Sequence, residues 1–465
     1  MSIAIGLMLC SGSQTVLGRD HSVSQGQAET HPAQAVMAMI GEGDRRCLVA
    51  ASDSAGDERV HLLSLYERVY GDLLWEDRER YEALINALDD LVGDGLDPVL
   101  YGAVQLREWR EVPRDRPNAR ACRDLLATSA YLTALHHLRN GFLPRQVLEP
   151  LWRENDDAAT DLPDTPAQEF NRIALQGLDD VAGAFQWARP AFAGYSDLRE
   201  AFLRWRDRYR FGDWVEIPGG PVIRPGDEDE RVPLLRQRLD LPLSSDDGEA
   251  AIPAMEERRY SGHVVAAVKA FQRTHGIKVD GVLGPETLAA LNVSRGFRQD
   301  QLRVNLERLR WLGSELRDDQ LLVDIAGART LLIRNRQVVW QGRAQVGTAA
   351  RPTPALSSRI THLTFNPSWT VPPTIYRKDK LPQIRRDPGY LASNRLRVLD
   401  RDGHELDPAT VDWNNPGAIV LRQDPGPANA LGQVALRFPN PFMVYLHDTP
   451  NQRLFESHLR TFSSG

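Results

Sequence analysis

The sequence predicts an α+β multidomain protein, with helical domains first and a mostly β domain last. A length of 465 residues suits about three domains. From residue 58 to about 220, apolar residues recur every three to four positions, as in amphipathic helices. After about residue 320, short β-branched runs are broken by Gly, Asn and Pro, as in strands and turns. The net charge of −7 shows no basic excess of the kind that nucleic-acid binding needs.

We expect residues 1–57 to form a disordered leader. Ile3 to Leu9 is a short apolar run that resembles the core of a signal peptide, although no basic residue precedes it. Cys10 would suit a lipoprotein, but Leu9 stands where a small residue is expected. The following stretch is rich in Gln, Ser, Gly and Ala without periodicity. Membrane contact is therefore expected only through an N-terminal signal or anchor.

A helical scaffold domain is predicted over 58–221. Its first helix carries an apolar stripe, a second helix ends at Gly93, and a third ends at Gly141. The stripe consists of Leu62, Leu63, Leu65, Tyr66 and Val69.

The cysteines and paired histidines of this region do not predict a metal site. Cys10, Cys47 and Cys122 are an odd, scattered set, which predicts neither a disulfide framework nor a zinc cluster. Cys122 has helical spacing and is expected to be a small buried apolar residue. His136 and His137 are adjacent and so do not share a helix face. We interpret them as surface histidines.

A compact three-helix unit is predicted over 222–295, after a Pro- and Gly-rich linker. Its last two helices lie in "AVKAFQRTHGIKVDGVLGPETLAALN", with Gly276 as a cap, an Asp280-Gly281 turn and Pro285 at a helix start. This pattern resembles the small peptidoglycan-binding domain found beside cell-wall enzymes. Because structural demands explain its glycines and Phe271, it predicts the fold more strongly than it predicts binding.

The third region, residues 300–465, begins with a helix in "QLRVNLERLRWL" and continues as short strands. Residues 387–415 are expected to be irregular, with charged turns. The stretch "VALRFPNPFMVYLHDTP" returns to strand and leads directly into His447.

Four separated motifs occur here in order: "RVNLERLRWL", "FNPSWTVPPTI", "RRDPGYL" and "FPNPFMVYLHDTPNQRLFESHLRTFSSG". Together they resemble the large, periplasm-facing L,D-transpeptidases. That family combines a scaffold domain, a peptidoglycan-binding domain and a YkuD-type catalytic domain that carries a cysteine. The resemblance covers about 58–465 and implies a cap over the substrate groove at about 380–432, with a mobile hinge at 424–432.

In that family Tyr-Leu-His-Asp-Thr-Pro precedes a Ser-x-Gly-Cys motif. His447 matches the histidine, and Ser464 and Gly465 match the two residues before the cysteine. Acyl transfer needs a nucleophile that forms a covalent intermediate, and His447 would take the proton of the thiol. Gly465 would let the backbone turn and aim its N–H groups at an oxyanion. The cysteine would be the next residue, so we expect a sequence cut short before it and a chain that is inactive as it stands.

Five further residues are candidates for substrate binding. Arg351 and Tyr376 could donate to an anionic substrate, although ordinary surface roles are an equal alternative. Trp369 is expected in the core at the floor of the site, and Tyr445 is expected on the strand that leads into His447. Asp448 either orients the loop or caps the following short helix.

The resemblance implies a transferase that joins peptidoglycan stem peptides, as donor and acceptor, through 3→3 crosslinks in the periplasm. No cofactor and no metal are expected. One alternative is a pseudoenzyme, a wall-binding scaffold without catalysis. Another is a zinc peptidase, but no paired His/Asp ligand motif supports it.

Overall fold

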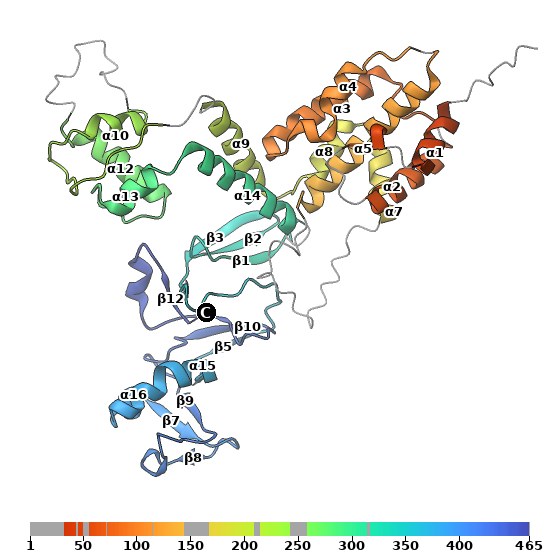
Figure 1. The fold of residues 1–465 in the computed structure, drawn as a ribbon. Helices are drawn as coiled ribbons and strands as arrows, with labels where there is room; N and C mark the ends of the chain where they lie inside the picture. Colours follow the sequence, from red (N-terminus) through yellow and green to blue (C-terminus); the bar gives the residue numbers. More distant parts are fainter. Residues whose placement is uncertain are drawn as a thin grey trace, which may run out of the picture.

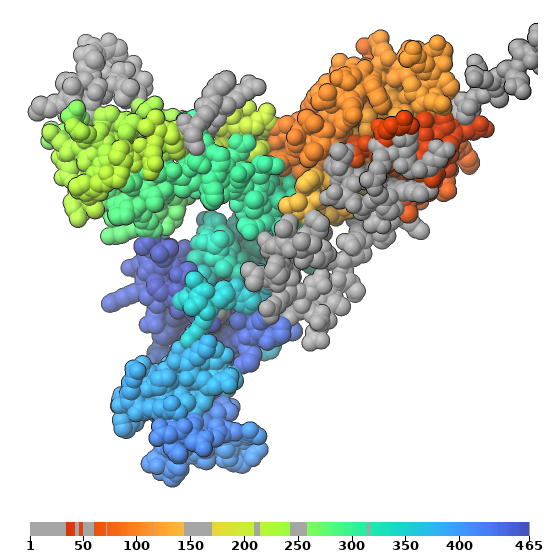
Figure 2. Space-filling model, viewed as in Figure 1, coloured from red at the N-terminus to blue at the C-terminus, as the bar shows by residue number. Residues whose placement is uncertain are grey.

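The computed structural model describes residues 32–42, 45–49, 55–70, 72–113, 115–143, 167–208, 214–241, 258–313 and 317–464. Figure 1 shows a large helical domain, a small helical domain, and a β-rich region that extends away from both. In the space-filling view of Figure 2 the β-rich region ends in a separate lobe. None of the helices in these residues combines the length and the apolar character that crossing a membrane requires. The predicted signal-like segment, 3–9, lies outside the described residues.

The large helical domain is built around a helix that is buried on nearly every side. In α5 every side chain from Asp124 to Leu135 is buried, and a helix that is buried all round belongs at the centre of a domain. The predicted end of this helix at Gly141 is confirmed. The helices are α1 (Pro32–Glu42), α2 (Ala55–Arg68), α3 (Arg78–Asp90), α4 (Ala103–Glu108), α5 (Pro117–Asn140), α7 (Ala167–Gln176), α8 (Val181–Ala188) and α9 (Ala193–Arg208), with 3-10 turns η1 (Arg45–Cys47), η2 (Leu91–Asp94) and η3 (Pro98–Tyr101).

Asp124 joins three segments around this central helix. Its carboxylate accepts hydrogen bonds from the Tyr66 hydroxyl (2.6 Å) and from the N–H groups of Leu74 (3.0 Å) and Trp75 (2.7 Å). Burial raises the pKa of Asp124 to about 6, although these hydrogen bonds favour the charged form. The folded protein therefore holds this proton more tightly than the unfolded chain. The stability that this proton contributes is present below the unfolded pKa of 3.8 and is lost as the pH rises through about 6.

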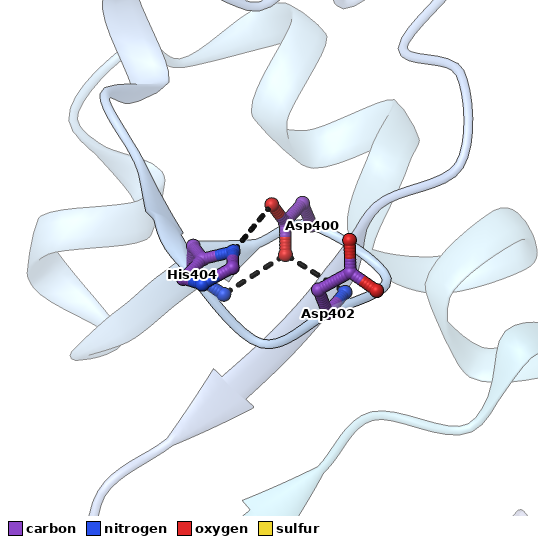
Figure 3. Close-up of side chains that lie close together, drawn as sticks. All are labelled: Asp400, Asp402 and His404. Atoms are coloured by element: carbon purple, nitrogen blue, oxygen red, sulfur yellow. Dashed lines mark hydrogen bonds and ion pairs between the residues drawn. The ribbon is translucent and has the colours of Figure 1, made fainter.

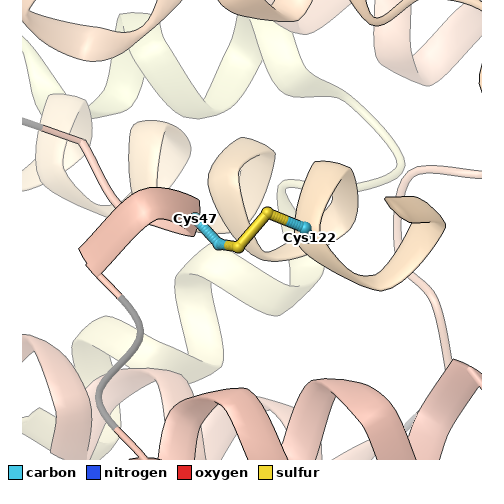
Figure 4. Close-up of a disulfide and its surroundings, with 2 residues drawn as sticks. All are labelled: Cys47 and Cys122. Carbon is cyan, nitrogen blue, oxygen red and sulfur yellow. A yellow bond between two sulfur atoms is a disulfide. The ribbon is translucent and has the colours of Figure 1, made fainter. Parts of the chain in front are cut away.

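Part of the predicted leader belongs to the scaffold core. In α1, Ala35, Val36 and Ile40 are buried in the same apolar cluster as the centre of α5. Cys47 and Cys122 form a disulfide that attaches η1 to α5 (Figure 4). The predictions of a disordered leader through residue 57 and of unpaired cysteines are therefore wrong. A pairing between cysteines 75 residues apart depends on the tertiary fold, which sequence spacing does not reveal.

His137 is also not a surface residue. It is 8% exposed, and one of its ring nitrogens, Nδ1, lies 2.8 Å from the Tyr101 hydroxyl. Burial lowers the pKa of His137 to about 3, so the ring is neutral at neutral pH. Its neighbour His136 is exposed, as predicted. Adjacent residues of a helix point in different directions, so His137 is buried while His136 is exposed.

The small helical domain contains α10 (Val232–Arg238), α12 (Gly262–Thr274) and α13 (Pro285–Leu291). The side chain of Gln272 contacts several residues of the sequence motif and so explains why they occur together. Its amide nitrogen donates to the Asp280 carboxylate, the Val282 carbonyl and the Thr287 hydroxyl, each at 3.1 Å, and its oxygen accepts from the Gly281 N–H at 2.9 Å. One buried amide thus connects α12, the Asp-Gly turn and α13. The motif is accounted for by folding alone.

The large helical domain and the helix that precedes the β-rich region meet at a buried ionic network. The fully buried Asp94 carboxylate accepts from the Arg189 guanidinium (2.8 Å and 3.1 Å) and the Tyr195 hydroxyl (2.8 Å). From α14 (Arg295–Gly313), Arg310 donates to the Asp94 carbonyl (2.7 Å) and pairs with Glu307 (2.5 Å). Since α14 leads directly into the β-rich region, this network joins that region to the scaffold.

The β-rich region consists of four small sheets. Their strand orders are β1-β2-β3, β11-β10-β5, β12-β4 and β6-β9-β7-β8. The strands are β1 (Gln320–Asp324), β2 (Arg329–Arg334), β3 (Gln337–Arg343), β4 (Val346–Gly347), β5 (His362–Phe365), β6 (Trp369–Thr370), β7 (Leu396–Leu399), β8 (Glu405–Leu406), β9 (Val420–Gln423), β10 (Val434–Arg437), β11 (Leu446–His447) and β12 (Thr461–Ser463). The prediction of strand before His447 is confirmed for Val434–Arg437 and Leu446–His447, whereas residues 438–445 between them form no strand.

Residues 369–429 form a lobe with an apolar core of its own, at the far end of the molecule in Figure 1. The stretch 387–415, predicted to be irregular, contains the antiparallel pair β7 and β8, and β7 also pairs with β9. Charged turn residues conceal the short buried strand Leu396–Leu399 in the sequence. The remaining elements are α15 (Pro373–Ile375), a π-helix η4 (Tyr376–Lys380), α16 (Leu381–Arg386), α17 (Tyr390–Ser393) and the 3-10 turns η5 (Pro408–Thr410) and η6 (Gln452–Glu456).

Replacing both Cys47 and Cys122 by Ala should lower the free energy of unfolding of the scaffold by about 4 kcal/mol, because the disulfide closes a long loop in the unfolded chain. Urea titration followed by circular dichroism measures this difference. Cys10→Ala is the matched control and should leave the curve unchanged. Equal stability of the double variant and the parent would contradict the prediction.

Candidate functional site

His447 ends the edge strand β11 with its side chain exposed to solvent. It lies opposite Ala435 of β10, which in turn faces Thr364 of β5, so a three-stranded sheet fixes its backbone. The ring nitrogen Nδ1 lies 2.5 Å from the carbonyl oxygen of Asp448. A proton on Nδ1 satisfies this contact and leaves the lone pair of Nε2 available as a base.

The pKa of His447 lies below its usual value. The surrounding protein atoms lower it most, and the positive charge of Arg437 lowers it further, against the opposing effects of the Asp448 carbonyl and carboxylate. The imidazole is therefore largely neutral at pH 7. A neutral imidazole is the form that can accept a proton.

Asp448 holds the loop beside His447. Its carboxylate accepts hydrogen bonds from the N–H of Gln433 (3.0 Å) and from the Gln452 side chain (2.9 Å). A Cβ at Gly432 would come within 2.4 Å of the Asp448 carboxylate, and the φ of Gly432 is +61°, so only glycine suits this position. Of the two predicted roles for Asp448, orientation of the loop is the one that these contacts support.

Tyr445 lies two residues before His447, and so on the same face of the chain. The two ring centroids are 5.8 Å apart. The Arg437 guanidinium lies over the Tyr445 ring at 4.0 Å from its centroid. This cation fixes the ring next to His447.

The predicted nucleophile motif follows strand β12, which pairs in parallel with β4. Val346 donates to the Arg460 carbonyl (2.9 Å), and Thr348 donates to the Ser463 carbonyl (3.3 Å). A Cβ at Gly347 would lie 2.2 Å from the carbonyl oxygen of Arg351, so only glycine fits beside the backbone of Arg351. Gly465 lies outside the described residues.

Arg351 connects this strand end to the lobe. Its guanidinium forms a bidentate ion pair with Asp379 of η4 (2.6 Å and 2.7 Å) and also donates to the Ser464 hydroxyl (3.2 Å). The hydrogen bonds from Arg351 hold the pKa of Asp379 below its usual value. Sequence analysis missed Asp379, which stands among basic residues in "YRKDK" and gives no signal of its partner. The structure thus places Arg351 next to Ser464.

Trp369 and Tyr376 belong to the lobe. Both are half-buried against its apolar core, and Lys380 lies 5.6 Å from the Trp369 ring centroid. Among the described residues, no group accepts from or donates to the buried Tyr376 hydroxyl. Burial raises the pKa of Tyr376. The predicted site residues therefore fall into three groups: Tyr445, His447 and Asp448 on β11 or next to its ends, Arg351 with Ser464, and Trp369 with Tyr376.

One group of potential metal ligands occurs within the described residues: Asp400, Asp402 and His404 (Figure 3). It lies on the exposed turn between β7 and β8. The Asp400 carboxylate accepts from the N–H groups of Asp402 (2.9 Å) and His404 (2.8 Å). These two hydrogen bonds close the turn, which explains the position of the Asp400 carboxylate.

Comparison with known proteins identifies three segments in order. Residues 61–202 match a family model described as "Scaffold domain", residues 249–291 match "Putative peptidoglycan binding domain", and residues 318–465 match "L,D-transpeptidase catalytic domain". A Haemophilus influenzae protein named "Putative L,D-transpeptidase" is 33% identical over 168 residues, which is 36% of this chain and 34% of that protein. The match spans about a third of the length of this curated relative.

We predict that His447 titrates with a midpoint below 6.5, since its surroundings lower its pKa. Nitrogen chemical shifts in an NMR pH titration measure the midpoint and identify the protonated nitrogen of the neutral ring. Free histidine in the same buffer serves as the comparison. A midpoint above 6.5, or a proton on Nε2 of the neutral ring, would contradict the geometry.

Asp379→Asn should loosen the end of β12, because Arg351 loses the charge that orients it toward Ser464. Amide exchange of residues 461–464 should become faster by roughly tenfold, the loss expected for a hydrogen bond to a charged group. Mass spectrometry of exchanged peptides measures this. Asp387→Asn, in the same lobe, is the matched control, and equal exchange in both variants would count against the role of Asp379.

Proposed function

We propose that this protein acts on peptidoglycan as an L,D-transpeptidase, because its three segments match models of a scaffold domain, a putative peptidoglycan binding domain and an L,D-transpeptidase catalytic domain. The donor is a tetrapeptide stem, and the acceptor is the side-chain amine of a neighbouring stem. The product is a 3→3 crosslink. The observation that carries this proposal is His447, an exposed, mostly neutral imidazole whose Nδ1 is held by the Asp448 carbonyl.

The nucleophile in this proposal is the cysteine of the family's Ser-x-Gly-Cys motif, whose first three residues match Ser463, Ser464 and Gly465. His447 removes the thiol proton, and sulfur attacks the carbonyl carbon of the donor peptide bond. The C–N bond breaks, the leaving amine takes the proton from His447, and a thioester remains. The acceptor amine then attacks the thioester, gives its proton to His447, and displaces the thiol.

The predicted substrate-binding residues have distinct roles in this proposal. Tyr445 and Asp448 shape the wall beside His447, and Arg351 positions Ser464 ahead of the nucleophile. Trp369 and Tyr376 pack against the core of the lobe whose residues 380–432 act as the cap, and Tyr376 is a donor to an anionic substrate group. The reaction needs neither a cofactor nor a metal.

We propose the periplasm as the location. The wall-enzyme domains imply a location outside the cytoplasm. The disulfide between Cys47 and Cys122 agrees with this, since disulfides persist mainly in oxidising compartments.

The test begins with the genomic DNA beyond codon 465. We expect a cysteine codon next, and we expect the extended protein to form 3→3 crosslinks from purified stem peptides, as measured by mass spectrometry. Residues 1–465 alone should form none, because their three cysteines are at positions 10, 47 and 122. His447→Ala in the extended protein should lower the rate by at least about a hundredfold, the contribution typical of a general base.

Crosslinks formed by residues 1–465 alone would contradict the assignment of the nucleophile. A stop codon directly after codon 465, in independent reads, would instead favour a wall-binding scaffold without catalysis.

A further inference from the structure

The lobe contains a pocket of about 420 Å³ that none of the predicted site residues line. Its walls come from the end of α17, the start of β7, the end of β9 and the loop 424–429. This volume lies within the usual range for small-molecule sites. From this pocket we propose a binding site for a carboxylate-terminated peptide, and specifically for the end of a peptidoglycan stem. The choice of peptide rests on the proposed function.

Arg395 supplies the charge. Its guanidinium forms no hydrogen bond or ion pair with any other described residue, and it reaches toward the loop, within 4.0 Å of where a Cβ on Gly426 would lie. The neighbouring Arg397 is instead committed to Asp424 (2.6 Å) and Glu405 (3.4 Å). Arg395 is therefore the guanidinium of the lining that remains available to a ligand. A guanidinium recognises a carboxylate through paired hydrogen bonds.

The backbone of Arg395 is held in an unusual conformation. Its φ is +53°, in the left-handed region that residues other than glycine rarely adopt. The Arg395 N–H donates to the Ala392 carbonyl at 3.1 Å. Strained residues of this kind concentrate at binding sites, where the fold fixes them against their local preference.

The buried side-chain amides of Gln423 and Asn429 hold the pocket loop in place in the absence of a ligand. The Gln423 side chain donates to the carbonyls of Asn394 (3.0 Å) and Ala428 (3.1 Å) and accepts from the Ala430 N–H (2.9 Å). Asn429, 1% exposed, donates to the Asp424 carbonyl (2.9 Å) and accepts from the Leu431 N–H (2.8 Å). The loop is therefore preorganised, which lowers the entropic cost of binding.

The rest of the lining selects a small apolar group next to the carboxylate. Leu391, Ala392, Pro425 and Ala428 contribute this surface. A terminal alanine presents a methyl group beside its carboxylate and fits both features. The loop continues to Gly432 and Gln433, which hold Asp448 beside His447, so the pocket and the candidate catalytic wall share one segment.

The test is calorimetric titration of residues 1–465 with a synthetic stem tetrapeptide that ends in a D-alanine carboxylate. We expect saturable binding, weakened at least about tenfold by Arg395→Ala and less by Arg395→Lys, which keeps the charge but not the paired donors. The same peptide with an amidated C-terminus should also bind at least about tenfold more weakly. Arg401→Ala, on the exposed turn after β7, is the matched control and should bind like the parent.

Unchanged affinity in Arg395→Ala, or equal binding of the amidated peptide, would overturn the proposal. Inorganic phosphate that competes as well as the peptide would also overturn it, by revealing a general anion site. Loss of binding in His447→Ala would assign the peptide to the catalytic wall instead. Crosslink formation by the extended protein is a separate readout, so binding through Arg395 without crosslinks from the extended protein would retain the pocket and contradict only the transpeptidase assignment.

Discussion

The buried carboxylate of Asp94 is the constraint on which the arrangement of the domains depends. A fully buried charge is tolerated only when it is paired and hydrogen-bonded, and here the partners come from separate segments of the chain. Arg189 and Tyr195 lie before and within α9, while Arg310 lies on α14 and reaches the Asp94 carbonyl. Leaving such a charge unpaired costs about 3–5 kcal/mol. Any arrangement of the domains that separates these segments is therefore strongly disfavoured. The direction in which the β-rich region leaves the scaffold follows from that requirement.

In the candidate site too, polar side chains join separate segments of the chain, but here the groups are exposed. Short strands with few neighbours cannot hold side chains firmly, so hydrogen bonds between side chains and backbone supply the missing order. Asp448 fastens the loop after His447 to Gln433, and Asp379 directs Arg351 toward Ser464. Asp379 belongs to the lobe and Ser464 follows strand β12, so a movement of the lobe would be transmitted to the strand end.

Local patterns in the sequence predicted the elements that local physics determines. The helix stop at Gly141, the turn at Asp280-Gly281 and the strand before His447 follow from backbone preferences and apolar spacing. The disulfide of Cys47 was missed because it depends on a partner far along the chain. Asp379 was missed for the same reason, since nothing near it indicates Arg351. The resemblance to a known family identified His447, but the contacts that fix its tautomer required the three-dimensional structure.

The helix α14 has one more consequence. It runs without interruption for 19 residues from the small helical domain to the first β-sheet, which corresponds to about 28 Å at 1.5 Å per residue. A continuous helix changes its length very little, and Arg310 anchors its last turns in the scaffold. α14 therefore acts as a rigid spacer that keeps the small helical domain at a nearly constant distance from the contact of Arg310 with the scaffold.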